Sequence, residues 1–439
     1  MFTRPAYLRG PSVKSEFVTR TAAPVQALTV ETTPLDDVRQ LIPFLDARHP
    51  LLWLRRGEGI AGVGEALRLE FSGATRVMDA ADAWRSLAAA ATVTDPVRVP
   101  GTGLVAFGTF AFADESEAAS VLIVPSIVVG RRAGRSWITR ISTIAPDAAD
   151  RPSRNDVAPI PRPTAFGPEF RLTMASGQLS AADYGDAVAS VVSRIEAGDV
   201  SKVVLSRELH AHLPVGADVR RALVELALAY SDCWTFAVDG FVGASPETLV
   251  RVTAGRVDAQ VLAGTAARGA NADTDGRAAT ALAASHKDRS EHAFAVDSVL
   301  EALAPHTRGL EASEPFALKL PNLWHLATDV AGPLADGSSA LDLVAALHPT
   351  AAVAGTPRAA ALEIIRELEP FDRGRYAGPV GWIGADGSGE WAVALRSAQI
   401  AANGDITAYA GGGIVADSDP VLEVAETTMK FRPIVEAFG

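Results

Sequence analysis

Apolar side chains recur at helical spacing in several stretches of the second half of the chain. In residues 181–197 they line one face of a predicted helix, and Gly198 directly after it is a common helix terminator. The same spacing predicts helices over residues 217–230, 277–303, 340–347 and 357–368, with Pro357 in the first turn of the last. A final helix is predicted to begin near Pro420.

Short apolar runs bounded by turn residues predict strands. "SKVVLSREL" is one, and after the helix of 217–230 the runs "CWTFAVDG", "FVGAS", "TLVRVTAG" and "RVDAQVLAG" indicate a meander. "AGPVGWIG", "WAVALRSAQIAA" and "ITAYAGGGIV" predict three more strands. The first 150 residues contain strand-like runs at 51–56 and 66–71, and a strand pair in "VLIVPSIVVGRR" and "SWITRIST". Strands grouped this way among helices favour an α+β fold.

The chain of 439 residues is longer than one small core requires, so length favours two or three domains or one large unit. The Pro-rich polar stretch 150–167 is the best linker candidate. It separates a β-rich portion, residues 1–160, from a second portion, residues 161–439.

The net charge of −12 argues against non-specific binding to nucleic acid or to an anionic membrane. An anionic substrate would therefore require locally concentrated positive charge or a metal ion. Cys233 is the one cysteine, which excludes an internal disulfide and a cysteine zinc site. The N-terminus lacks the apolar segment of a signal peptide, and no apolar run is long enough to predict a membrane span. We expect a soluble cytoplasmic protein.

Two glycine runs allow a ligand-binding and a structural interpretation. "GEGIAGVG" matches the dinucleotide pattern loosely, but it lies between two strand-like runs, so a hairpin is favoured. Gly411, Gly412 and Gly413 end a predicted strand shortly before a helix. Such a loop either offers backbone N–H groups to a carboxylate or phosphate, or is a plain turn.

Two acidic pairs share one spacing. Asp288 and Glu291 are three residues apart in one predicted helix, and Glu423 and Glu426 in another. Residues three apart are neighbours on a helix, so two facing pairs would gather four carboxylates, a set that suits Mg²⁺. The alternative is two solvated helix faces.

Three charged residues have both a structural and a functional interpretation. Lys202 begins a predicted strand, where burial would lower its pKa and a neutral amine could act as a general base. Glu247 lies in the turn "SPET", where nearby carboxylates would raise its pKa and make it a general acid. Arg396, inside an apolar strand, requires a carboxylate partner from the protein or from a substrate. His325 and His348 are interpreted as core or hydrogen-bonding histidines instead of metal ligands.

These signals occur together in a known order. "KVVLSRE", "GASPETLV", "LAGT", "DRSEH", "LHPTAAVAGTPR", "YAGPVGW", "ALRSAQI", "YAGGGIV" and "EVAETTMK" resemble the successive motifs of the chorismate-utilising enzymes. The resemblance covers about residues 170–439 and is looser before them. It implies two packed β-sheets flanked by helices, with residues 1–160 in the same body as a chorismate-binding core of residues 161–439.

The resemblance also implies site residues. In this family Mg²⁺ lies between two acidic helices and holds the ring carboxylate of chorismate, which implies Glu291 and Glu426 as direct ligands. Asp288 and Glu423 would act behind them or through water, although the family more often has Glu at the first of these positions. The implied substrate-binding residues are Arg396, Tyr376, Gly411 and Gly413 at the enolpyruvyl carboxylate, Lys430 and Thr265 at the ring carboxylate, and Gly264 and His325.

Lys202 separates the subfamilies, because aminating relatives typically carry Gln at its position. A lysine implies a base that activates water for attack at C2, while Glu247 protonates the departing C4 hydroxyl. The implied function is that of a monomeric, Mg²⁺-dependent isochorismate synthase, an isomerase that serves menaquinone or siderophore synthesis.

Three alternatives remain open. They are a bifunctional salicylate synthase, an aminating anthranilate or aminodeoxychorismate synthase, and a non-catalytic chorismate-binding protein. Ala352 and Val353 in "PTAAVAG" favour the isochorismate synthase, because salicylate synthases tend to be more polar there.

Overall fold

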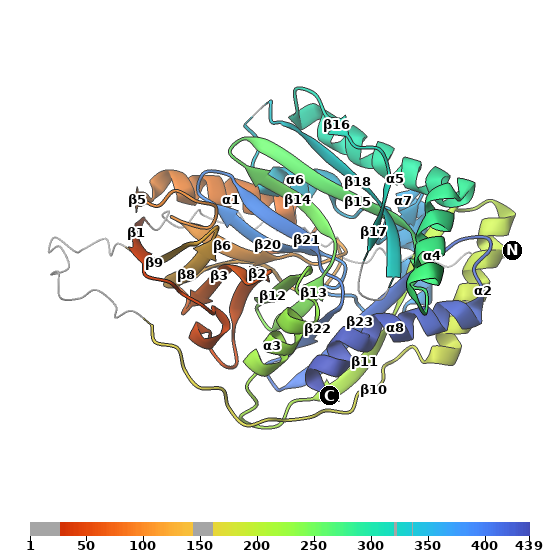
Figure 1. The fold of residues 1–439 in the computed structure, drawn as a ribbon, viewed down its shortest axis with the longest axis horizontal. Helices are drawn as coiled ribbons and strands as arrows, with labels where there is room; N and C mark the ends of the chain where they lie inside the picture. The colour runs from red at the N-terminus through yellow and green to blue at the C-terminus, as the bar shows by residue number, and fades with distance from the viewer. Residues whose placement is uncertain (1–26, 144–160, 320–322, 336) are drawn as a thin grey trace, which may run out of the picture.

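The computed structural model describes residues 27–143, 161–319, 323–335 and 337–439, without the side chains of Lys287, Glu291 and Leu323. The strands form two large sheets with helices around them (Figure 1). Sheet A contains, in spatial order, β10 (Ala175–Ser176), β11 (Lys202–His212), β23 (Asp405–Ile414), β22 (Ser397–Ile400), β13 (Phe241–Ser245), β12 (Trp234–Val238), β2 (Leu51–Arg55), β3 (Glu58–Val63), β8 (Ile127–Arg132), β9 (Arg135–Thr143), β1 (Leu28–Leu35) and β5 (Thr92–Thr94), with β19 (Gly355–Thr356) beside β11. Sheet B contains β16 (Glu311–Ala312), β18 (Leu323–Pro333), β15 (Arg256–Ala267), β14 (Thr248–Thr253), β21 (Gly389–Val393), β20 (Pro379–Gly384), β6 (Val105–Thr109), β7 (Ser120–Val124) and β4 (Leu67–Phe71), with β17 (Phe316–Lys319) beside β18.

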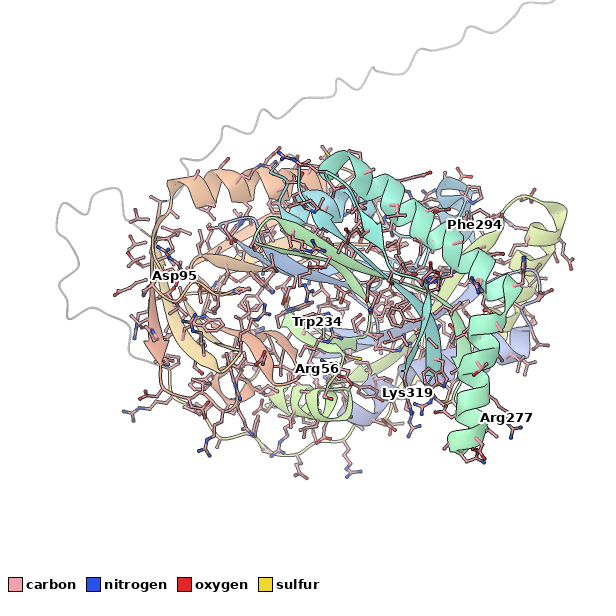
Figure 2. All side chains as sticks on the ribbon, turned by 45° about the horizontal axis from the view of Figure 1, so that its top comes forward. Arg56, Asp95, Trp234, Arg277, Phe294 and Lys319 are labelled. Atoms are coloured by element: carbon pink, nitrogen blue, oxygen red, sulfur yellow. The ribbon has the colours of Figure 1, made fainter. Side chains whose placement is uncertain are left out.

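Strands from both portions of the chain build both sheets. β2 pairs with β12 in sheet A, and β6 pairs with β20 in sheet B. Trp53 and Trp234 stack across the first of these junctions with their ring centroids 4.8 Å apart, and Figure 2 shows Trp234 in the middle of the molecule. The predicted α+β fold with two sheets is confirmed. The division at residue 160 stays a prediction, because most of the Pro-rich stretch lies outside the described residues.

The helices are α1 (Arg76–Ala90), α2 (Ala181–Ala197), α3 (Arg220–Ala229), α4 (Ala272–Ala284), α5 (His286–Leu303), α6 (Ala340–Leu347), α7 (Arg358–Leu368) and α8 (Pro420–Phe438), with short 3₁₀ turns at Ile42–Phe44 and Ala304–His306. The helices predicted over 181–197 and 340–347 and near Pro420 are confirmed. Ser180 and Asp183 form a capping box at the start of α2, and Gly198 ends it with a φ of 87°.

Other helix boundaries were predicted wrongly. The single helix expected over 277–303 is two helices, α4 and α5, because Ser285 leaves the helical conformation. The Ser285 side chain instead accepts a hydrogen bond from the Asp288 N–H and caps α5. α3 begins three residues after the predicted start, and Pro357 is the cap of α7 instead of lying in its first turn.

The predicted meander and the predicted strand "WAVALRSAQIAA" are each divided between the two sheets. β13 of sheet A ends at Ser245 and β14 of sheet B begins at Thr248; β21 of sheet B ends at Val393 and β22 of sheet A begins at Ser397. The two crossings are hydrogen-bonded to each other, because the Val393 N–H donates to the Glu247 carbonyl at 3.1 Å and the Ser245 hydroxyl to the Val393 carbonyl at 2.5 Å. Glu247 and Arg396 therefore lie in adjacent crossings.

Both glycine runs lie in strands. "GEGIAGVG" contains β3, which forms the expected hairpin with β2 and is followed by strand β4, so it is no dinucleotide loop. Gly411, Gly412 and Gly413 pair with β11 near the end of β23, so the predicted strand is confirmed and the interpretation of the glycines as a loop is wrong. Position 411 requires glycine, since a β-carbon on Gly411 would lie 2.4 Å from the Leu205 carbonyl oxygen.

The two acidic helices cover different sheets. α5 packs on β15 of sheet B, whereas α8 packs on β23 of sheet A and against α2 and α3 (Figure 1). The site predicted between them therefore depends on how the two sheets meet.

Candidate active site

Lys202 is the first residue of β11 and is partly buried. β11 pairs with β23 so that Val204 lies opposite Gly413. A β-carbon at Gly413 would lie 2.8 Å from Cε of Lys202 and 3.4 Å from its Nζ. The lysine side chain therefore lies over the bare backbone of Gly413, and not outward as an ordinary strand-end lysine would.

Glu247, in the first crossing, is partly buried. Burial raises the pKa of its carboxyl to about 7, against the opposing effect of the positive charges of Lys202, Arg396 and Lys430. The positive charges of all three residues act on the Glu247 carboxyl, so they belong to its electrostatic surroundings. A carboxyl group with this pKa carries a proton in a large fraction of molecules near neutral pH, as a general acid requires.

Arg396, in the second crossing, has a left-handed backbone with a φ of 50°. The expectation that it lies inside a strand is wrong, since its strand stops on either side of it. Its guanidinium is partly buried and makes neither a hydrogen bond nor an ion pair with any residue that the structure describes. A partly buried guanidinium requires an acceptor, and the charge of this one acts on Glu247 and Tyr376, so a ligand carboxylate in the same site is the fitting partner.

Tyr376 supplies a neutral hydroxyl close to Arg396. The ring is buried and stacks on Tyr409, with centroids 5.2 Å apart and an interplanar angle of 13°. Burial raises the pKa of Tyr376 to about 12, although Arg373 and Arg396 act in the opposite direction. The hydroxyl stays protonated at neutral pH and can donate to the same carboxylate that Arg396 binds.

α8 brings two carboxylates and a lysine to β23. Lys430 donates to the Gly411 carbonyl at 2.7 Å and forms an ion pair with Glu426 at 2.6 Å. Burial opposes ionisation of Glu426, but Lys430 holds the pKa of this carboxyl below its ordinary value. Burial raises the pKa of Glu423, whose Oε1 accepts from Ser418 at 2.7 Å.

Among the residues that the structure describes, none is a hydrogen-bond partner of the second carboxylate oxygen of Glu423. Oε2 is buried without a hydrogen bond, and Gly412 makes room for it, because a β-carbon there would lie 2.7 Å from this atom. Glu426 lies close enough to raise the pKa of Glu423 further. Two neighbouring carboxylates with an orphaned buried oxygen form an oxygen-rich set that fits a hard divalent cation.

β15 brings the remaining predicted residues together at a bulge between Ala263 and Thr265. Gly264 in this bulge has a φ of 77°, and a β-carbon on it would lie 3.2 Å from Cβ of Asp288 in α5. His325 Nδ1 donates to the Gly264 carbonyl at 3.2 Å and lies 3.3 Å from the Thr265 hydroxyl. The bulge thus joins the helix of the first acidic pair to β18.

The electrostatic surroundings of His325 include residues of α8. Burial, helped by Arg396 and Lys430, lowers the pKa of His325 to about 4, while Glu426 acts in the opposite direction. His325 is therefore neutral, and the residues that act on its pKa belong to β15, to the second crossing and to α8. His348 donates from Nε2 to the Phe112 carbonyl at 2.9 Å, which confirms the expectation of a hydrogen-bonding histidine.

The predicted metal ligands are brought together only in part. The side chain of Glu291 lies outside the described residues, so its role stays a prediction. Within the described part of the chain, no group of three or more His, Cys, Asp or Glu side chains is placed to hold a metal. Glu423 and Glu426 are neighbours, and Asp288 lies across the site beside Gly264.

A buried polar network behind Lys202 was not expected from the sequence. Glu369 accepts from the Ser206 N–H at 2.7 Å and from its hydroxyl at 2.9 Å. Arg373 donates to Glu369 at 2.6 Å, to the Val353 carbonyl at 3.0 Å and to the Val204 carbonyl at 2.6 Å. This network fixes β11 against the segment "PTAAVAG". The sequence does place Glu369 and Arg373 four residues apart directly after α7, but a Glu and an Arg at this spacing are too common to predict a buried network.

Comparison with known proteins identifies the family. The model of the family described as "Chorismate binding enzyme" matches residues 20–439. The chain belongs to this family. Isochorismate synthase DhbC of Bacillus subtilis is 42% identical over 270 residues, which cover 58% of this chain and 68% of that protein. The salicylate biosynthesis isochorismate synthase of Pseudomonas aeruginosa is 35% identical over 436 residues, which cover 94% of this chain and 90% of that one.

Solved structures support the fold of this family member. The DhbC protein of Bacillus anthracis aligns with a TM-score of 0.72 at 30% identity, covering 90% of this chain and 98% of that one. The menaquinone-specific isochorismate synthase of Escherichia coli aligns with a TM-score of 0.76 at 24% identity, covering 94% and 95%. The expectation of a chorismate-utilising enzyme is confirmed, and chorismate is the small molecule that such an enzyme binds.

Proposed function

We propose that the protein is an isochorismate synthase, an isomerase that moves the hydroxyl of chorismate from C4 to C2. The observation that carries the proposal is the pairing of Lys202 and Glu247 in one site, with the carboxyl of Glu247 at a pKa of about 7. The comparisons agree with this expectation, because the named relatives include isochorismate synthases.

The charges of the site fit a dianionic substrate. Arg396 and the Tyr376 hydroxyl would bind the enolpyruvyl carboxylate, together with the backbone at Gly411 and Gly413. Lys430 and Thr265 would lie toward the ring carboxylate, beside Gly264 and His325. Locally concentrated positive charge of this kind lets a protein of net charge −12 bind an anion.

The reaction requires one base and one acid. Neutral Lys202 would take a proton from water, whose oxygen attacks C2 of the ring. The ring double bonds shift, and the C4 hydroxyl leaves with the proton of Glu247 as water. One water is added and one is lost, so the sum is an isomerisation. The ionised Glu247 and protonated Lys202 then return to their starting states through solvent.

Mg²⁺ fits this site as the cofactor. Glu291 and Glu426 would hold the ion, with Asp288 and Glu423 behind them or bridged by water. The orphaned Oε2 of Glu423 beside Glu426 supports the assignment. When bound, Mg²⁺ would neutralise the ring carboxylate and draw electron density from the ring.

The product separates the proposal from its alternatives. With chorismate and Mg²⁺, the purified protein is expected to accumulate isochorismate in a time course followed by chromatography, and omission of ammonia should not change the rate. Salicylate and pyruvate as the accumulating products would assign a salicylate synthase instead. A product that depends on ammonia would assign an aminating enzyme, and no turnover would leave a chorismate-binding protein.

We further propose that the enzyme acts as a monomer in the cytoplasm. Among the helices of the described residues, none has the length and apolar character needed to cross a membrane. Size-exclusion chromatography with light scattering tests the proposed monomeric state, and a mass of two or more chains would contradict it. Isochorismate can be consumed by a menaquinone or a siderophore route, and both remain compatible with the proposed activity.

A further inference from the structure

Arg207 is a buried arginine on β11 that contacts α8. Its side chain is 5% exposed. Its Nε donates to the Thr427 hydroxyl at 2.8 Å, and a terminal nitrogen donates to the Thr428 hydroxyl at 3.0 Å. The guanidinium also lies over the ring of Phe431, with 4.9 Å to the centroid. All three partners belong to α8, the helix that carries Glu423, Glu426 and Lys430.

The two threonines connect Arg207 to the turn of α8 that carries Glu423 and Glu426. The hydroxyl of Thr427 donates to the Val424 carbonyl at 2.8 Å, and that of Thr428 donates to the same carbonyl at 3.0 Å. Val424 follows Glu423 directly and precedes Glu426 by two residues. The hydrogen bonds thus run from β11 to the backbone turn between the two carboxylates.

Arg207 approaches α8 from the face of the sheet where Glu423 lies. It pairs in register with Ala410, two residues from Gly412, over which the orphaned oxygen of Glu423 is placed. β11 also begins with Lys202. One strand therefore holds the proposed base at its first residue and fixes the acidic helix five residues later.

The chemistry of Arg207 indicates orientation more than packing. Among the residues described, no carboxylate lies within ion-pair distance of its guanidinium. Burial of a charge without a neutralising partner is costly, and an apolar side chain would fill the same space more cheaply. What an arginine adds is a planar fork with two directed hydrogen bonds, and these set both the rotation and the register of a helix.

We infer that Arg207 is a positioning residue that fixes α8 over sheet A and thereby holds Glu423 and Glu426 in the geometry that binds Mg²⁺. The inference rests on the proposed function, since it assumes that these carboxylates serve a metal. It assigns to Arg207, Thr427 and Thr428 an effect on metal affinity, although none of them contacts the ion.

The test measures Mg²⁺ binding without substrate. Isothermal titration calorimetry with MgCl₂ is carried out on the wild-type protein, Arg207→Gln, Arg207→Lys, Thr428→Val and Thr428→Ser, together with thermal unfolding of each. Arg207→Gln and Thr428→Val are expected to raise the Mg²⁺ dissociation constant about tenfold or more, the effect typical of groups that orient metal ligands. Thr428→Ser keeps the hydroxyl and should bind as the wild type does. Arg207→Lys keeps one donor and should fall between.

Arg220→Gln is the matched control for a general loss of stability. Arg220 is also buried and lies over an aromatic ring, that of Phe166, but it pairs with Asp218 at the start of α3. This variant should unfold at a lower temperature and keep the wild-type Mg²⁺ affinity. If Arg207→Gln and Thr428→Val bind Mg²⁺ like the wild type, the inference is wrong while the proposed function stands. If the wild-type protein itself binds no Mg²⁺, the proposed metal site is wrong, and the role inferred for Arg207 is wrong with it.

Discussion

Replacement of Lys202 by glutamine is expected to lower kcat for isochorismate formation by about 10²- to 10⁴-fold, the range that general acid–base groups contribute. The lysine side chain lies over Gly413 and its charge acts on Glu247, and in the proposed mechanism its amine takes the proton of the attacking water. Glutamine keeps most of the side-chain length and a hydrogen-bond donor but cannot take a proton. Steady-state rates at saturating Mg²⁺ and chorismate measure the effect, and KM is expected to change much less than kcat.

Two controls separate proton transfer from charge and folding. Lys202→Arg supplies a permanent positive charge without a usable base, so it should be as inactive as the glutamine variant. Lys319→Gln removes a lysine at the exposed end of β17, which Figure 2 shows beside α4, and should leave the rate unchanged. Wild-type activity in Lys202→Gln would rule out the general-base assignment, and activity in Lys202→Arg would assign an electrostatic role instead.

Replacement of Glu247 by glutamine is expected to have the second large effect, again about 10²- to 10⁴-fold on kcat. The C4 hydroxyl cannot leave without a proton, and glutamine has the shape of a protonated glutamate but no acidic proton. In the wild-type enzyme the acid must be protonated, so kcat should fall as the pH rises through about 7, the value to which burial raises the pKa of Glu247. A pH profile of kcat, with the wild type and the variant compared at each pH, gives both results.

Glu247 also links stability to pH. Its pKa is about 7 in the folded protein and 4.5 in its ordinary state, so between these values the folded protein binds a proton that the unfolded chain does not. Glu247 therefore makes its full contribution to the free energy of unfolding below about pH 4.5, and this contribution is lost as the pH rises toward 7. Glu247→Gln, which never ionises, should unfold at a higher temperature than the wild type above pH 7. An inactive variant that is instead less stable at that pH would show that Glu247 serves the fold and not the chemistry.

The sequence predicted those parts of the fold that depend on local pattern. α2 and α6 follow from apolar spacing and capping residues within their own segments, and their bounds were predicted correctly. α4 and α5 were merged, because Ser285 breaks the helix through its own backbone conformation while the apolar spacing continues past it. The order of the motifs predicted the family, and the resemblance to that family predicted the two packed sheets.

Long-range arrangement could not be read from the same pattern. The run containing Arg396 looked like one continuous strand, and the runs on either side of the Glu247 turn looked like neighbouring strands of one meander, since apolar residues in either sheet give the same alternation. The structure places both residues where the chain passes from one sheet to the other, which brings an acid and a guanidinium without a partner among the described residues to one site. Arg207 was not singled out either, because its partners lie about 220 residues further along the chain, in α8.

In the proposed mechanism the new hydroxyl comes from solvent water, which is taken up on one side of the ring, and the old hydroxyl is released as water from the other. The most direct test is turnover in water enriched in oxygen-18, with mass spectrometry of the isochorismate formed in the first part of the reaction. The mechanism predicts one oxygen-18 atom per product molecule, located in the C2 hydroxyl, and none in the remaining chorismate at that stage. Isochorismate that keeps only the oxygen atoms of the original chorismate would show that the hydroxyl migrates within the molecule, and the roles given to Lys202 and Glu247 would be wrong.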